Sequence, residues 1–143
     1  IQNNQGNTAL MFAALNSGTV ILSSQLQSLF PEIDPNIQNN DQETALMLMS
    51  KSRYFSAKTM SQFLDTFPNV DVNNQNLQGE TALILAINHD NVSLVALLLE
   101  RFPDLYIHQH IANPTDKTAL VRAIEESKLG VLSLLLKHII EIN

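Results

Sequence analysis

The chain has 143 residues, a length that fits one domain. Its 45% hydrophobic and 15% charged residues are typical of a folded chain rather than a disordered one. The net charge of −6 with eight scattered Lys and Arg residues argues against nucleic-acid binding, and no apolar run reaches the roughly 18 residues of a membrane span.

The tripeptide Thr-Ala-Leu occurs four times along the chain. The copies begin at Thr8, Thr44, Thr81 and Thr118, so the spacings are 36, 37 and 37 residues. An asparagine stands five positions before each threonine, at Asn3, Asn39, Asn76 and Asn113. A fixed period of this size is the signature of stacked repeats, and together with the helical spacing of the apolar residues it predicts an all-α solenoid.

Each copy predicts a turn, a short helix and a second helix. The threonine has N-cap chemistry, because its hydroxyl can accept a hydrogen bond from a free N–H of the first turn. Apolar residues follow at helical spacing in both segments. We therefore expect eight helices in four antiparallel pairs, with strand confined to the hairpin tips. The expected starts are Thr8, Thr19, Thr44, Ser56, Thr81, Asn91, Thr118 and Lys128.

The second copy departs from the pattern inside its first helix. Met49 stands where the other copies have alanine, which predicts helices that pack more loosely or lie farther apart. Tyr54 and Phe55 follow in the linker, and we expect at least one in the core. The first two copies also carry three and four extra residues before Asp34 and Asp71, which we place at the end of the second helix.

These residues resemble the ankyrin repeat. The resemblance rests on Thr81-x-Leu83-x-x-Ala86, on a second helix ending in Leu97-Leu98-Leu99, and on Asp71-Val72-Asn73. It covers all four copies, with repeats at about 1–36, 37–73, 74–106 and 107–143 in a single domain. The family's proline is alanine in every copy, and its histidine is Met11, Met47, Ile84 and Val121.

The resemblance implies a protein-interaction scaffold. Ankyrin partners usually lie across the hairpin tips and the concave face of the first helices. Transferred by position, the expected binding residues are Asn7, Asn40, Asp41, Glu43, Lys51, Leu77, Gln78, Glu80, Asn88, His89, Lys117, Glu125 and Glu126. Leu77, apolar among polar tip residues, is the expected anchor.

Catalysis, cofactors and metals find little support in the sequence. Cysteine is absent, which excludes thiolate catalysis and cysteine-based zinc sites. His108 and His110 could share one face of a strand, but no third ligand is evident beyond Asp104, Asp116 or His89. Adjacent Glu125 and Glu126 point in different directions on a helix. We expect no enzyme activity, no cofactor and no metal site.

An alternative is that the chain is the targeting arm of a larger enzyme. Asn and Gln total 25 residues, and with the absence of Cys this composition would suit an exported bacterial effector acting in the host cytoplasm. Otherwise we expect an intracellular protein. The identity of the partner is not encoded in any motif.

The ends of the chain suggest a fragment with packed neighbours. Residues 1–31 carry no charged side chain, although terminal repeats of a stack need a polar outer face. Residues 131–136 and 139–140 are similarly apolar at the other end apart from Ser133. We expect further repeats of the same parent chain, apolar surface on the first helix pair, and self-association there.

Overall fold

The computed structural model describes residues 1–16, 25, 27–52, 55–103, 105 and 119–142. Its labelled helices are α1 (Ala9–Leu15), α3 (Ala45–Ser50), α4 (Ala57–Thr66), α5 (Ala82–Asn88), α6 (Val92–Arg101), α7 (Ala119–Glu125) and α8 (Leu129–Ile142). Residues 27–29 are also helical. The expected starts at Thr19 and Thr118 lie outside the described residues.

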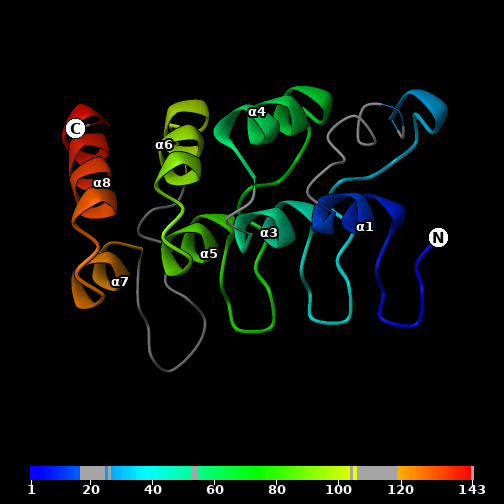
Figure 1. Cartoon of the computed structure of the whole chain (residues 1–143), viewed down its shortest axis with the longest axis horizontal. Coiled ribbons are helices and arrows are strands. Elements are labelled where there is room, and N and C mark those ends of the chain that lie inside the picture. The colour runs from blue at the N-terminus through cyan, green and yellow to red at the C-terminus, as the bar shows by residue number, and fades with distance from the viewer. Residues whose placement is uncertain (17–24, 26, 53–54, 104, 106–118, 143) are drawn as a thin grey trace.

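The helices form two layers, with hairpin loops projecting from one side (Figure 1). The inner layer is a row in which α1 contacts α3, α3 contacts α5 and α5 contacts α7. In the outer layer α4 contacts α6 and α6 contacts α8. The predicted all-α stack of helix pairs is confirmed.

The projecting hairpins contain no strand in the part of the chain that the structure describes. An isolated antiparallel bridge joins Gln2 to Thr8 at the base of the first hairpin. None of the described helices has the length and apolarity that crossing a membrane requires.

Five of the expected helix starts are N-caps in the structure, including three of the threonines predicted to cap. Each capping side chain accepts a hydrogen bond from the backbone N–H three residues later, and each of the threonine and serine caps has extended backbone angles. The donor–acceptor distances are 3.2 Å at Thr8, 3.3 Å at Thr44, 3.2 Å at Ser56, 3.4 Å at Thr81 and 3.1 Å at Asn91. The bond satisfies one of the free N–H groups of each first turn.

The inner helices are too short to be stable by themselves. α3 has six residues and α5 has seven, whereas isolated helices below about 12 residues are marginal in water. Every residue of α3 is buried, as are residues 82–87 of α5. These helices therefore depend on apolar contact with the neighbouring repeats on both sides.

The turn from an inner helix to its outer partner uses a residue with left-handed backbone. Asp90 has φ 56° and Ser127 has φ 53°. The next residue then donates back into the helix, from Asn91 N to Ala86 O at 2.8 Å and from Lys128 N to Ala123 O at 3.0 Å. These bonds satisfy carbonyls that the helix end leaves free.

In the second repeat α3 and α4 approach closely at few points, whereas α5 packs along α6 in the third. Met49 and Phe55 are both buried in the core, which confirms the prediction for the linker. The placement of the extra residues was partly wrong. Ser56 lies twelve positions after Thr44, whereas Asn91 lies ten positions after Thr81. Part of the extra length therefore lies between α3 and α4.

Replacing Thr81 with alanine tests whether the capping hydroxyls stabilise the stack. We expect the free energy of unfolding to fall by about 1 kcal/mol, because a free N–H of α5 loses its partner. The urea midpoint measures this change, and Thr81→Ser, which keeps the hydroxyl, is the control. An unchanged midpoint in the alanine variant would show that the hydroxyl does not cap α5.

Candidate binding surface

A single asparagine closes each described hairpin. The side-chain oxygen of Asn76 accepts hydrogen bonds from the backbone N–H of Gln78 at 3.0 Å and of Glu80 at 2.8 Å. The same pairs recur at Asn39, with Asp41 and Glu43, and at Asn3, with Gln5 and Asn7. The repeated asparagine therefore adds two side-chain bonds to the backbone bonds that close each hairpin, such as Asn76 N to Glu80 O at 3.0 Å.

The hairpin turn also requires a left-handed residue two positions before each capping threonine. Gly6 has φ 76° and Gly79 has φ 74°, but Gln42 at the same position has φ 58°. A side chain at Gly6 would lie 2.8 Å from the backbone nitrogen of Asn40 in the next hairpin. Glycine there permits both the turn and the close stacking of neighbouring hairpins.

A ladder of glutamines joins the hairpins at their base. The Nε2 of Gln38 donates to Gln42 O in its own hairpin at 2.5 Å and to Gln75 O in the next at 2.8 Å. Gln2 makes the equivalent pair of bonds to Gly6 O and Gln38 O. The sequence reasoning missed this ladder, although Gln2, Gln38 and Gln75 recur with the threonine spacing.

Backbone bonds join the hairpins near their tips as well. The N–H of Asn40 donates to Gln5 O at 3.0 Å, and the N–H of Leu77 donates to Asp41 O at 3.1 Å. The Nδ2 of Asn40 adds a bond to Asn4 O at 3.1 Å. The three tips therefore form a row whose relative positions are fixed by hydrogen bonds (Figure 1).

In the second and third repeats the residue just before the cap contacts the far end of its own inner helix. Glu43, a buried residue, forms an ion pair with Lys51 at 2.8 Å. Glu80 accepts from Nδ2 of Asn88 at 2.9 Å and lies 3.6 Å from the guanidinium of Arg122 in the following repeat. Both carboxylates, expected in the binding strip, are thus held in contacts within the chain.

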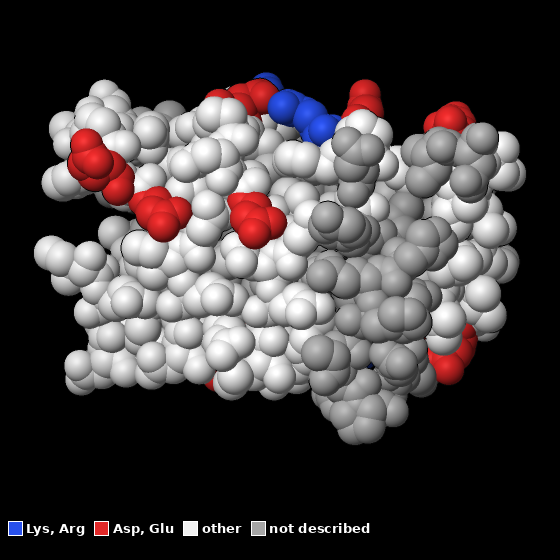
Figure 2. All heavy atoms as spheres, turned by 180° about the vertical axis from the view of Figure 1, so that it is seen from behind, with Lys and Arg blue, Asp and Glu red and all other residues white. Residues whose placement is uncertain are grey.

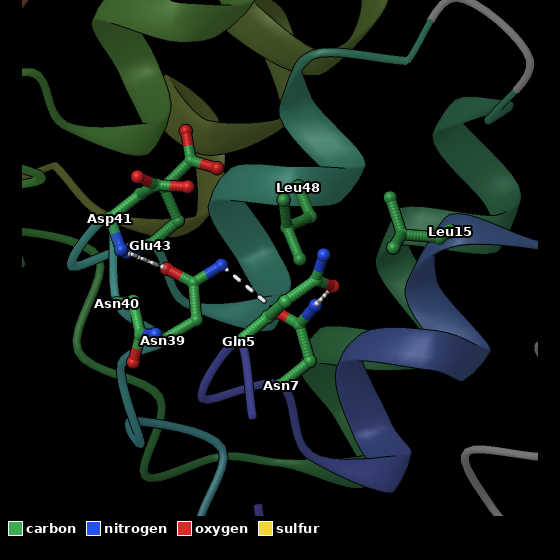
Figure 3. Close-up of a pocket in the computed structure, with 8 residues that line it drawn as sticks. All are labelled: Gln5, Asn7, Leu15, Asn39, Asn40, Asp41, Glu43 and Leu48. Carbon is green, nitrogen blue, oxygen red and sulfur yellow. Dashed lines mark hydrogen bonds between the residues drawn. The ribbon is translucent and has the colours of Figure 1, made fainter. Parts of the chain in front are cut away.

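A shallow cavity of about 400 Å³ lies between the first two hairpins and their inner helices (Figure 3). Leu15 and Leu48 line its helical side, from α1 and α3. The remaining lining residues are polar and come from the hairpins: Gln5, Asn7, Asn39, Asn40, Asp41 and Glu43. Four expected residues, Asn7, Asn40, Asp41 and Glu43, therefore line one concave feature.

The most exposed apolar side chain on the three described tips is Leu77. It is 56% exposed, and its neighbour Gln78 is exposed as well. The preceding tip exposes Asn40 and Asp41. The structure therefore places these four expected residues on two adjacent tips, with Leu77 available as an anchor.

The remaining expected residues lie at the ends of the inner helices. Asn88 and His89 are half-buried, and a ring nitrogen of His89 lies 2.9 Å from Leu85 O. Glu125 and Glu126 are exposed, with Glu126 paired to Lys128 at 2.8 Å. Lys117 lies outside the described residues, as do His108 and His110. Within the described part no group of three or more His, Asp or Glu could hold a metal.

The face opposite the view of Figure 1 shows scattered acidic side chains (Figure 2). Basic atoms in the described, coloured part of this face gather at one place, next to acidic atoms. One exposed basic residue of the outer layer, Arg101, donates to Asp65 at 2.7 Å and to Ser61 at 2.7 Å. This pair links α6 to α4 across two repeats.

Replacing Gln42 with glycine tests the turn requirement. The left-handed backbone of Gln42 costs a residue with a side chain roughly 1–2 kcal/mol. Glycine avoids this cost, but it loses more conformational entropy on folding, which offsets part of the gain. We expect a net gain of about 0.5–1 kcal/mol, measured by denaturant unfolding. The matched change Gly79→Ala should lower stability by about 1 kcal/mol. A loss of stability with Gln42→Gly, or a gain with Gly79→Ala, would contradict the geometry of these turns.

Comparisons with known proteins agree with the fold. The family model described as ankyrin repeats (3 copies) matches residues 21–105 and residues 48–143. No curated protein matches the sequence. A similar solved structure is the ankyrin repeat domain of Bcl-3, described as a unique member of the IkappaB protein family, with a TM-score of 0.77 and 29% identity. The alignment covers 96% of this chain and 58% of that chain, so this chain spans less than two thirds of its length.

The family match and the structure rest on the same features. The matched ranges together span residues 21–143, which is most of the sequence, and they include three of the four Thr-Ala-Leu copies. The helix pairs, the hairpins and the inner-layer contacts repeat with the same period. The chain therefore belongs to the ankyrin-repeat family.

Proposed function

We propose that this chain binds another protein through its hairpin tips and the concave face of its inner helices. Ankyrin repeats generally mediate interactions between proteins, and the family is shown for this chain. The observation that carries the proposal for this surface is the exposed Leu77 on a row of hydrogen-bonded tips. The proposed strip contains all the residues expected from the sequence.

Rigid tips favour binding, because little conformational entropy is lost when a partner docks on loops that are already ordered. The backbone of each described tip is held by its asparagine and by the neighbouring hairpin. Binding energy in interfaces is concentrated in a few apolar or aromatic anchors surrounded by polar contacts. Leu77, with Gln78 and Asp41 beside it, has this arrangement.

The strip divides into two groups by what its side chains already contact. Leu77, Gln78, Asn40 and Asp41 project from the tips and are proposed to touch the partner. Glu43 and Glu80 are proposed to position the surface, since each is held by a residue at the end of its inner helix. We therefore expect changes at Glu43 and Glu80 to reduce stability along with binding.

We propose no catalytic role for the chain itself. The cavity at the tips is shallow and open, and its side chains are amides, carboxylates and leucines. A targeting arm of a larger enzyme, including an exported bacterial effector, would use the same strip for its own partner. That alternative differs from the leading proposal only in what is attached outside these 143 residues.

A pair of matched single changes tests the surface. Leu77→Glu places a carboxylate on the tips, and Ser93→Glu places one at an exposed position of the outer helix α6. Each is compared with the unchanged chain in affinity capture from extracts, followed by quantitative mass spectrometry. We expect a specific partner to lose at least ten-fold in recovery with Leu77→Glu and to be retained by Ser93→Glu.

The thermal stability of both variants separates binding from folding. Leu77 and Ser93 are exposed, and exposed substitutions usually change stability by less than about 0.5 kcal/mol. A partner lost with Ser93→Glu but kept by Leu77→Glu would place the binding surface on the outer layer and contradict the proposal.

A further inference from the structure

The cavity between the first two hairpins opens where the first repeat lacks the polar pair of the next two repeats. In those repeats the residue before the cap meets the end of the inner helix, as Glu43 meets Lys51 at 2.8 Å. The first repeat has Asn7 and Leu15 at the same two positions, and a leucine cannot form such a bond. The side chain of Leu15 is therefore free to line the cavity, and it is 52% exposed.

The openness of this position is a property of the concave face. Lys51 is the equivalent residue of the second repeat, which has a repeat on either side, and its side chain is still 40% exposed. The eight residues that line the cavity are all described, and they come from two neighbouring repeats within the chain. The openness of the cavity therefore does not depend on what lies beyond either end of the sequence.

A chain of side-chain amides forms the polar wall of the cavity (Figure 3). The Nδ2 of Asn39 donates to Oδ1 of Asn7 at 3.0 Å, and the Nδ2 of Asn7 donates to Oε1 of Gln5 at 3.3 Å. The oxygen of Asn39 accepts from the backbone N–H groups of Asp41 and Glu43. The three amide oxygens of this wall therefore already have hydrogen-bond partners.

Two acceptor groups of the cavity have no hydrogen bond among the described residues: the carboxylate of Asp41 and the Oδ1 of Asn40. Asn40 donates through its Nδ2 to Asn4 O at 3.1 Å, and Asp41 makes its bonds through its backbone. The other lining carboxylate, Glu43, is neutralised by Lys51. The cavity therefore combines an apolar helical side with an acidic rim whose acceptors are free.

We propose that this cavity binds an arginine side chain of the partner protein, an inference that rests on the proposed function. The aliphatic stem of the arginine packs against Leu15 and Leu48, and its charged head reaches Asp41 at the rim. A guanidinium carries five N–H donors in a planar fork. This fork matches a carboxylate beside a free amide oxygen better than the single ammonium of lysine does.

The charges of the hairpins also favour a cationic segment. The three described hairpins, residues 1–8, 37–44 and 74–81, hold three carboxylates and no Lys or Arg. Glu43 and Glu80 have partners within the chain, which leaves the carboxylate of Asp41 for the partner protein. The backbone oxygen of Asp41 accepts from the N–H of Leu77, so the proposed anchor and the acidic rim are neighbours. One segment of the partner can therefore contact both.

An NMR titration of the 143-residue chain with N-acetyl-arginine methylamide tests the cavity. We expect the methyl signals of Leu15 and the amide signals of Asn40 and Asp41 to shift together, with a dissociation constant on the order of 1 mM for so small a probe. The citrulline probe replaces the charged guanidinium with a neutral urea, and the norleucine probe keeps only an apolar stem. Both should bind about five-fold more weakly, because they lose the charge pair with Asp41.

Two matched variants separate the local charge from the net charge. Asp41→Asn keeps the shape of the exposed side chain and removes its charge, whereas Asp90→Asn removes one charge from a turn that lines a different cavity. We expect the arginine probe to bind about five-fold more weakly to Asp41→Asn and unchanged to Asp90→Asn. Equal binding of the arginine and citrulline probes, equal weakening by both variants, or no saturable shift would each overturn the proposal.

Capture of the partner distinguishes failure of this inference from failure of the proposed function. A partner that is lost with Leu77→Glu but fully retained by Asp41→Asn would keep the tip surface and overturn the arginine proposal. A partner retained by both variants would overturn the tip surface itself. An arginine probe that binds while the partner ignores both changes would show a cation site that the partner does not use, and this too would overturn the proposal.

Discussion

The described surface depends on the hydrogen bonds that one asparagine side chain in each described hairpin accepts from the loop backbone. The hairpins that the structure describes contain no strand, and the side-chain oxygen of Asn76 accepts hydrogen bonds from two backbone N–H groups of its loop. These bonds fix the path of the chain into Thr81, whose hydroxyl caps the N-terminus of α5. Hairpin and helix start are thus one local structure, and the same structure begins α1 at Asn3 and α3 at Asn39.

Repetition turns this weak local structure into a stable one. Inner helices of six or seven residues gain their stability from burial between neighbours rather than from propensity. The glutamine amides of Gln2 and Gln38 and the backbone N–H groups of Asn40 and Leu77 add bonds from each hairpin to the next. Each repeat therefore orders the tips of its neighbour, which gives the chain a preorganised surface.

The sequence alone was sufficient for the fold, because its period and caps are local signals. Helices start as predicted at Thr8, Thr44, Ser56, Thr81 and Asn91, and the three threonines cap them as predicted. The exposure and contacts of the expected binding residues were harder to predict. Glu43 and Glu80 look like exposed tip residues in sequence, but the hairpin folds back so that they meet Lys51 and Asn88, eight positions later. Such pairings depend on tertiary geometry that no helical or strand spacing reveals, whereas the glutamine ladder had a periodic signal that could have been found.

The most direct test of the preordered surface is hydrogen exchange of single backbone amides by NMR. Asn40 and Leu77 are exposed residues on loop tips, yet their N–H groups donate to the preceding hairpin. If the tips are held as described, both amides exchange much more slowly than the same groups in an unstructured peptide, and replacing Gln38 with alanine speeds the exchange of both. Exchange of Asn40 and Leu77 at the unstructured rate in the unchanged chain would contradict the account, because the row of tips would then not be ordered before a partner binds.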